Sequence, residues 1–184
     1  KSTGRGAGRV TAVHKANVLR MSDGLFLDCV RETAARYPDI ALEEQLIDAM
    51  CAHLVRRPAD FDVVCTTNMY GDILSDLAAE LAGGIGLAAS LNAGEDAALA
   101  QAQHGSAPDI AGQNKATPIA AIDSMGLLLR EVGRIKGNEA AVKAGDRIGA
   151  AVQAATPNFA GKSLDRSGHS TSDIGQMVID ALPS

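Results

Sequence analysis

The residues Asn68-Met69-Tyr70-Gly71-Asp72-Ile73-Leu74-Ser75-Asp76 form the stretch around which the rest of the chain is organised. They follow Phe61–Thr66, a short run rich in β-branched residues that predicts a buried parallel strand. Gly71 is typical of a sharp turn out of such a strand, and a helical pattern starts directly after it. We therefore expect a strand, a turn and a helix in immediate succession.

The predicted helix carries two carboxylates on one face. Asp72 and Asp76 are four residues apart, so both lie along the same side of its first turns. The two anions repel each other there, and the positive helix N-terminus offsets only part of that repulsion. A divalent cation such as Mg²⁺ or Mn²⁺ would relieve the rest by taking oxygen ligands from both. The simpler alternative is that Asp72 caps the helix and Asp76 is solvated, but the preceding strand and glycine favour a metal site.

Three stretches together resemble a known family. Asn68–Asp76 closely resembles the signature of the β-decarboxylating dehydrogenases, which include isocitrate, 3-isopropylmalate, homoisocitrate and tartrate dehydrogenases. His14–Leu19, which reads H-K-A-N-V-L, and His104–Gly112, which reads H-G-S-A-P-D-I-A-G, resemble two further motifs of that family in the same order. These motifs belong to the second half of the longer family members. The resemblance therefore implies that this chain is the C-terminal part of a larger enzyme.

Composition excludes several classes of protein. The net charge of −5 argues against a nucleic-acid partner, which requires a basic face. No apolar run approaches the ~20 residues that cross a bilayer. Cys29, Cys51 and Cys65 lack the spacing of a zinc site or a disulfide framework, and their apolar surroundings predict buried thiols in a reducing compartment. We expect a cytoplasmic protein that binds neither nucleic acid nor membranes.

The first motif follows a predicted strand. Val10–Val13 should deliver His14 and Lys15 at its C-terminal end, where ligands bind in open α/β sheets. Most lysines are simply solvated. The resemblance implies instead that Lys15 reaches the active site of the neighbouring subunit and relays a proton, and that Asn17 contacts substrate or nicotinamide. We interpret His14 as a structural neighbour, and the glycine-rich segment before the strand, Lys1–Arg9, as a flexible connector rather than a phosphate loop.

Two helices are predicted next, from a Ser22 cap to about Arg36 and from about Leu42 to Arg56. Asp48 lies off the apolar face of the second helix and would ordinarily be a surface carboxylate. The family has a similar L-I-D-A-M helix whose aspartate crosses the dimer interface, so the resemblance makes Asp48 a further metal ligand. The residues predicted to face inward are Leu25, Cys29, Val30 and Ala34 on the first helix, and Leu46, Ile47, Met50 and Leu54 on the second.

The second half begins with Gly83–Leu87, a turn signal near a helix C-terminus. Residues 97–103 predict a weak strand, and His104–Asn114 has the composition of a loop, where cofactors often bind. From Pro118 onward the pattern is helical. A second helix should cover about Glu139–Ala155, and a last helix should start at a Ser172 cap and bury Ile174, Met177, Val178 and Leu182.

The loop would bind a nicotinamide dinucleotide, as the resemblance implies. Asp109 occupies the position that reads the adenosine ribose, where a carboxylate accepts hydrogen bonds from free hydroxyls and repels a 2′-phosphate. NADP-preferring relatives carry Lys-Tyr in place of Asp109-Ile110, so NAD is expected. Gln101 replaces the glutamate that relatives carry three residues before the loop histidine, and Thr117 replaces the usual asparagine before the proline. The residues implied in cofactor binding are His104, Gly105, Ser106, Ala107, Asp109, Ile110 and Thr117.

These observations predict an α/β fold of the isopropylmalate/isocitrate dehydrogenase type. Residues 1–83 would form part of the dimer-forming domain and residues 84–184 the C-terminal part of the cofactor-binding domain. The resemblance implies NAD-dependent oxidative decarboxylation of a 2-hydroxy acid with Mg²⁺ or Mn²⁺, in a homodimer that shares its active site across the interface. Two alternatives are a silent regulatory subunit of a heteromeric dehydrogenase, which Gln101 and Thr117 favour, and a structural metal-binding domain without turnover.

Overall fold

A computed structural model describes residues 8–158 and 168–183 of the chain. The chain forms two compact units, Lys1–Ala78 and Ala79–Ser184. The division falls in the last turns of a helix, a few residues before the expected boundary at 83/84. Most of the predicted connector Lys1–Arg9 lies outside the described residues, and Arg9 already belongs to the first strand.

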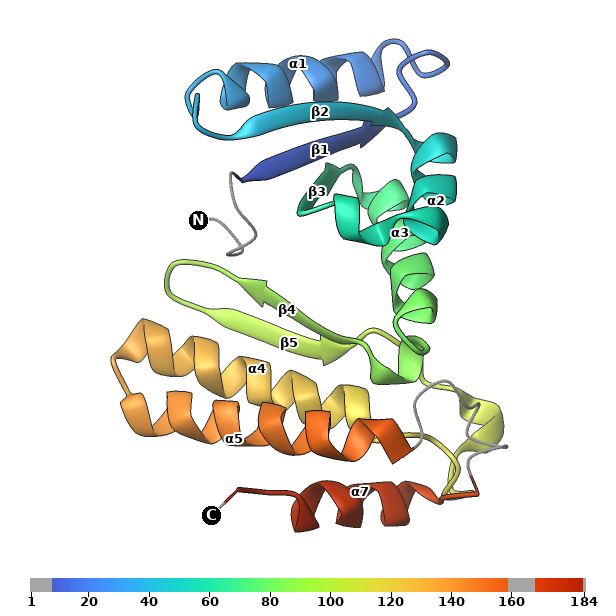
Figure 1. Cartoon of the computed structure of the whole chain (residues 1–184), viewed down its shortest axis with the longest axis vertical. Helices are drawn as coiled ribbons and strands as arrows, with labels where there is room; N and C mark the ends of the chain where they lie inside the picture. The colour runs from blue at the N-terminus through green and yellow to red at the C-terminus, as the bar shows by residue number, and fades with distance from the viewer. Residues whose placement is uncertain (1–7, 159–167, 184) are drawn as a thin grey trace. The chain divides into compact units, whose positions relative to one another are not determined.

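The first unit is built on a parallel sheet with the strand order β2-β1-β3 (Figure 1). His14 at the end of β1 is opposite Leu46 at the end of β2, and Val13 is opposite Thr66 at the end of β3. All three strands therefore end at the same edge of the sheet. The elements are β1 (Arg9–His14), α1 (Ser22–Ala34), β2 (Ala41–Leu46), α2 (Ile47–Arg56), the 3₁₀ turn η1 (Pro58–Asp60), β3 (Val63–Thr66) and α3 (Asn68–Leu81).

The central strand β1 is the most buried part of this unit. Val13 has no exposed surface and packs against Met50 and Leu54 of α2 and Leu74 of α3. Helix α1 lies over the opposite face, where Val10 and α1 residues line an apolar pocket. The parallel sheet is therefore covered on both faces, as such sheets generally are.

Three predictions for the first unit are wrong in detail. Residues 41–46 form strand β2 and not the start of a helix, because pairing with β1 overrides their helix-forming composition. Strand β3 is parallel as predicted, but Val63 and Val64 are exposed because β3 is an edge strand here. Helix α3 starts at Asn68, so Gly71 lies inside it, and the chain leaves the strand at Thr67, whose carbonyl accepts a hydrogen bond from Gly71 N.

Helix α1 also differs from the prediction. Ser22 is its first helical residue rather than its cap, and Met21 occupies the cap position without a side-chain cap. Leu25 is 66% exposed and Cys29 is exposed, whereas Leu27 is buried. The cysteines are free, as predicted, but none is fully buried: Cys29 is exposed, and Cys51 and Cys65 are half-buried.

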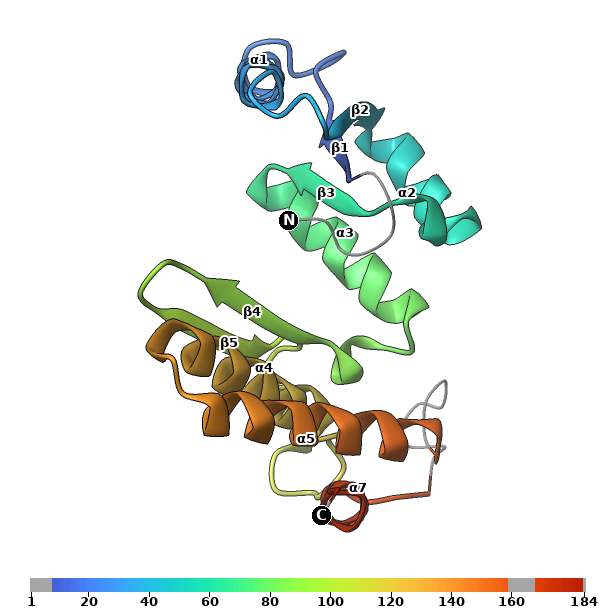
Figure 2. The same ribbon diagram turned by 60° about the vertical axis from the view of Figure 1, so that its left-hand side comes forward.

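The second unit consists of a β-hairpin and three helices that follow one another in layers (Figures 1 and 2). The antiparallel hairpin packs on α4, α4 packs on α5, and α7 packs on the far side of α5. Its elements are η2 (Ile85–Leu87), β4 (Ala89–Ala93), β5 (Ala98–Ala102), η3 (Pro108–Ile110), α4 (Ile119–Lys136), α5 (Glu139–Ala155), η4 (Thr156–Asn158) and α7 (Thr171–Asp180).

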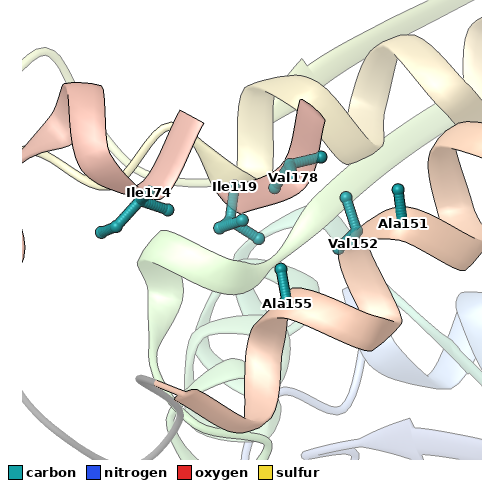
Figure 3. Packing of buried hydrophobic residues seen from close by; sticks show 6 residues of the cluster. All are labelled: Ile119, Ala151, Val152, Ala155, Ile174 and Val178. Atoms are coloured by element: carbon teal, nitrogen blue, oxygen red, sulfur yellow. The ribbon is translucent and has the colours of Figure 1, made fainter. Parts of the chain in front are cut away.

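An apolar cluster joins the three helices of the second unit (Figure 3). Ile119 of α4 and Ile174 of α7 are almost completely buried in it. The two long helices approach so closely that Gly145 of α5 has no room for a side chain. A Cβ there would lie 2.5 Å from the carbonyl oxygen of Gly126 and 2.9 Å from the backbone nitrogen of Arg130, both on α4. The cluster consists of Ile119, Ala151, Val152, Ala155, Ile174 and Val178.

Most predictions for the second unit are confirmed. The turn after α3 is present: Gly84 has a φ of 120°, and its N–H closes the helix end on the Ala79 carbonyl. The expected strand in 97–103 is β5, and α4 and α5 occur where predicted. The partner of β5, strand β4, was not predicted: Ala89–Ala93 alternates apolar and polar residues over only five positions and contains no β-branched residue.

The last helix begins earlier than predicted. Its cap is Ser170 and not Ser172, and Ser170 forms a capping box with Asp173. Of the four residues expected to be buried, Ile174 and Val178 are buried, Met177 is half-buried and Leu182 is exposed. Among the helices that the structure describes, none combines the length and apolar character needed to cross a membrane.

Candidate functional site

The side chains expected to do chemistry in the first unit lie at one edge of the sheet. Lys15 directly follows the end of β1, Asp48 lies in the first turn of α2 after β2, and α3, which carries Asp72 and Asp76, follows β3. Because the strands are parallel and in register, Lys15, the first turn of α2 and the start of α3 are at their common carboxyl edge, and Asp72 and Asp76 follow on the next turns of α3. Ligands bind at that edge in open α/β sheets.

The structure brings Lys15 and Asp48 into direct contact. The Lys15 Nζ donates a hydrogen bond of 2.6 Å to Asp48 Oδ1. The Lys15 side chain is 24% exposed and that of Asp48 is 66% exposed, so the pair is open to solvent on the carboxylate side. The hydrogen bond from Lys15 is the main cause that lowers the pKa of the Asp48 carboxyl. The Asp48 carboxyl is therefore anionic and largely exposed to solvent.

Asp72 and Asp76 lie on α3 with exposed side chains, one turn of helix apart. Because α3 begins at Asn68, they are on its second and third turns rather than at its N-terminus. Two carboxylates at this spacing supply the oxygen donors that Mg²⁺ and Mn²⁺ prefer. Within residues 8–158 and 168–183, no three His, Cys, Asp or Glu side chains come close enough to hold a metal. Within the described residues, α3 thus presents two carboxylates on neighbouring turns.

The two polar neighbours of Lys15 in the first motif have different surroundings. His14 is buried at the end of β1, and its Nδ1 lies 3.0 Å from the backbone nitrogen of Ala16, which donates to it. The hydrogen bond gives His14 a structural role, because it helps to fix the backbone at the start of the loop after β1. Asn17 is exposed, which leaves its amide accessible to a ligand.

The loop after β5 forms a pocket of about 440 Å³, a volume within the usual range for ligand sites. His104, Gly105, Ser106, Ala107 and Ile110 line it, as sequence analysis grouped them. Asp109 is exposed and Thr117 half-buried, and neither is part of this lining. The remaining lining residues are Ala111, Gly112, Asn114, Lys115, Ala116 and Thr171.

The backbone of this loop is strained at one point. Ala107 has a φ of 43°, in the left-handed region that L-residues other than glycine, asparagine and aspartate rarely adopt. Ala107 directly precedes the short η3 turn, and Asp109 lies in that turn. Strain of this kind, of order 1–3 kcal/mol, is concentrated at functional sites.

Sequence analysis missed the contacts that hold the loop in place. Asn114 Oδ1 accepts hydrogen bonds from the backbone nitrogen and the hydroxyl of Ser172, at 3.1 and 3.0 Å. Its carbonyl accepts from Thr171 N, and the Thr171 hydroxyl donates to the carbonyl of Ala116. The N-terminus of α7 is therefore held against the loop by four hydrogen bonds. These residues are far apart in the chain, so no local pattern announces the contact.

Sequence analysis also missed the role of Asp23. Its side chain is 3% exposed, and its Oδ2 accepts a 2.6 Å hydrogen bond from the backbone nitrogen of Lys15. A buried carboxylate is uncommon unless it is well paired. The only sequence signal was an acidic residue at the point where the helix meets the sheet.

Comparisons with known proteins find clear relatives of this chain. A family model described as isocitrate/isopropylmalate dehydrogenase matches residues 2–178. The mitochondrial catalytic subunit 5 of NAD isocitrate dehydrogenase from Arabidopsis thaliana is 55% identical over 137 residues, which are 74% of this chain and 36% of that protein. The chloroplastic 3-isopropylmalate dehydrogenase of Solanum tuberosum is 55% identical over 128 residues, covering 69% and 36% of the two chains.

A solved structure extends the likeness to nearly the whole chain. The crystal structure of isocitrate dehydrogenase from Methylococcus capsulatus superimposes with a TM-score of 0.86 and 40% sequence identity. The match covers 96% of this chain and 51% of that one. The present chain thus spans about half of that enzyme, and the regions matched in the two plant proteins are about a third of their length.

Proposed function

Because the chain belongs to the isocitrate/isopropylmalate dehydrogenase family, we propose that the protein to which it belongs catalyses the NAD-dependent oxidative decarboxylation of a 2-hydroxy acid. The substrate is of the isocitrate or 3-isopropylmalate type, as the names of the relatives indicate. The observation that carries the proposal is the 2.6 Å contact between Lys15 Nζ and Asp48 Oδ1 at the carboxyl edge of the sheet. In the proposal, Lys15 is the proton carrier and Asp48 a metal ligand, and this contact supports their acting at one site.

The active site in this proposal is shared between two copies of the chain. Lys15 and Asp48 protrude together from one subunit, and Asp72 and Asp76 come from the other. Two ligands from α3 and one from α2 of the second copy give the metal three anionic oxygens. Their combined negative charge favours Mg²⁺ or Mn²⁺ over softer metals. The exposed face of Asp48 leaves room for that approach.

The residues of this chain have separate tasks in the reaction. Lys15 Nζ moves a proton at the reacting centre, and its contact with Asp48 holds it near the metal ligands. Asn17, exposed on the same loop, orients substrate or nicotinamide. When bound, NAD⁺ supplies a hydride acceptor and the divalent cation supplies Lewis-acid polarisation of a keto oxygen.

The loop His104–Asn114 binds the adenosine part of NAD⁺ in the proposal. The pocket that it forms is large enough for a nucleoside, and its strained backbone is preorganised. Asp109 is exposed beside the pocket, where its carboxylate accepts hydrogen bonds from ribose hydroxyls and repels a 2′-phosphate. Gln101, an exposed residue of β5, and Thr117 depart from the family pattern, but they leave the lysine and the carboxylates in place.

The metal site provides the test. Asp72→Asn and Asp76→Asn in the full-length protein should each weaken Mn²⁺ binding by at least ~10-fold, because a hard cation loses an anionic oxygen ligand. Isothermal titration calorimetry measures the affinity. Asp39→Asn is the matched control, since it removes the same charge at an exposed position outside the site. Unchanged Mn²⁺ affinity in both site variants would contradict the proposed metal site.

Turnover of the full-length protein on its own separates the enzyme from the alternative of a silent regulatory subunit. The enzyme should oxidise isocitrate or 3-isopropylmalate with NAD⁺ in the presence of Mn²⁺ without any other polypeptide. A protein that binds Mn²⁺ through Asp72 and Asp76 but turns over neither substrate would favour the regulatory alternative.

A further inference from the structure

A buried carboxylate lies directly beneath the proposed catalytic lysine and has no part in the function proposed above. Asp23, at the second position of α1, is 3% exposed. A buried carboxylate is costly unless its oxygens are hydrogen-bonded. Here they are: Oδ2 accepts from Lys15 N at 2.6 Å, and Oδ1 lies 3.3 Å from the hydroxyl of Ser22. Both carboxylate oxygens of Asp23 therefore have a hydrogen-bond partner.

The hydrogen bond between Asp23 and Lys15 N belongs to a set that fixes the conformation of the loop after β1. The carbonyl of Lys15 accepts hydrogen bonds from Val18 N and Leu19 N, at 2.9 and 2.8 Å, so the loop is wound about this residue. The Leu19 carbonyl in turn accepts from Asp23 N at 3.0 Å. Asp23 thus closes the loop at both ends, with its backbone on Leu19 and its side chain on Lys15.

A second element lies next to the carboxylate. Tyr70, on α3 two residues before Asp72, is 6% exposed, and its hydroxyl lies close to the Asp23 side chain. Asp23 therefore lies between the lysine loop and the helix that carries the proposed metal ligands.

We propose that Asp23 is a positioning residue that sets the location of the Lys15 side chain through the Lys15 backbone nitrogen. Lys15 is then held at two points, its backbone by Asp23 and its ammonium group by Asp48. A long lysine side chain otherwise loses its geometry easily, and a misplacement of about 1 Å at a catalytic group can reduce turnover by ~10²-fold. The inference rests on the function proposed for Lys15.

Two substitutions of nearly equal size isolate the hydrogen bond. Asp23→Asn keeps an oxygen that accepts from Lys15 N, while its amide can donate to the hydroxyl of Tyr70 or Ser22. Asp23→Leu fills the same space without an acceptor. Replacing a buried charge by an apolar residue of similar volume is often tolerated by the fold. The comparison of Leu with Asn at position 23 therefore reports the contact rather than the packing.

Hydrogen exchange of the full-length protein, followed by mass spectrometry, is the first readout and needs no substrate. Asp23→Leu should accelerate exchange in the segment Lys15–Leu19, whereas Asp23→Asn should leave it near the wild-type rate. Steady-state kinetics is the second. Asp23→Leu should lower kcat by ~10- to 100-fold with the KM for NAD⁺ within twofold, and Asp23→Asn should stay within a few-fold of wild type.

Mixed dimers identify the partner through which Asp23 acts. A subunit with Asp23→Leu has intact metal carboxylates, so mixing it with Asp72→Asn subunits should restore activity at the one site that combines the two intact halves. Mixing it with Lys15→Met subunits should restore none, because no site then contains a correctly placed lysine. Recovery with Lys15→Met subunits would overturn the proposal.

Two other results would overturn it as well. One is a kcat of Asp23→Leu within twofold of wild type, and the other is a reduced kcat with unchanged exchange at Lys15–Leu19. The failure of the proposed function has a different signature: the wild-type protein would turn over neither substrate, or Lys15→Met would itself be active. In that case the exchange data still decide whether Asp23 holds the loop, because they do not depend on catalysis.

Discussion

Because α4 and α5 approach closely, we expect Gly→Ala substitutions at two positions of α5 to have opposite effects on the stability of the fold. Gly145 and Gly149 both lie in the interior of α5, where alanine is the better helix former by about 1 kcal/mol. They differ only in what a new methyl group would meet. At Gly145 it would lie 2.5 Å from the Gly126 carbonyl oxygen, and at Gly149 its nearest neighbour is Arg130 Nη2 at 3.6 Å.

The magnitudes follow from these distances. At Gly145 the obstacle is backbone on α4, which cannot rotate away, so the helices must separate and disturb the cluster around Ile119. Overpacking of this kind costs about 1–3 kcal/mol, which equals or exceeds the gain in helix propensity. At Gly149 the contact is ordinary and the neighbour is the end of a flexible side chain, so most of the propensity gain should remain.

Thermal unfolding of the full-length protein measures both effects. Gly145→Ala should lower Tm by up to ~8 °C and Gly149→Ala should raise it by up to ~4 °C, since 1 kcal/mol corresponds to about 2–4 °C for 150–250 residues and to less for a longer protein. Gly149→Ala is the control for helix propensity, because the chemical change is identical. An increase in Tm for Gly145→Ala equal to that for Gly149→Ala would refute the close packing of the two helices.

Three further substitutions test the proposed site. Lys15→Met should lower turnover by ~10²-fold or more in steady-state kinetics and leave NAD⁺ affinity, measured by calorimetry, nearly unchanged. Turnover within a few-fold of wild type across the pH range would exclude Lys15 as the proton relay. Replacing Asp109-Ile110 with Lys-Tyr should shift the ratio of kcat/KM towards NADP⁺ by ~10- to 100-fold, mostly through KM, and an unmoved ratio would contradict the role of Asp109. Ser172→Ala removes one of two hydrogen bonds to Asn114 Oδ1 and should raise the KM for NAD⁺ about fivefold with kcat unchanged, whereas an unaltered KM would show that α7 does not position the loop.

Features that depend on neighbours in the sequence were predictable. The helices α4 and α5 follow from apolar residues at three- and four-residue steps, and the turn after α3 follows from Gly83 and Gly84, whose φ angles are positive. The three motifs are likewise local, and they indicated the family that the comparisons show. The loop from His104 was recognisable because glycine and proline interrupt every periodic pattern.

Features that depend on contacts between distant segments were not predictable. Ala41–Leu46 consists of residues that favour helices, and only pairing with β1 makes it a strand. Burial was misjudged for the same reason: the pattern of α1 predicted an inward Leu25, but which face is covered depends on where the sheet lies.

The sequence by itself determined which residue types are present and which local elements carry them. The tertiary structure decided which of them meet. Lys15 contacts Asp48 because β1 and β2 are parallel and in register, so that residues 33 positions apart emerge at the same edge. Asp23 reaches Lys15 N because α1 lies against that edge. Hydrogen bonds act over about 3 Å of space and are indifferent to distance along the chain, so only the folded backbone selects their partners.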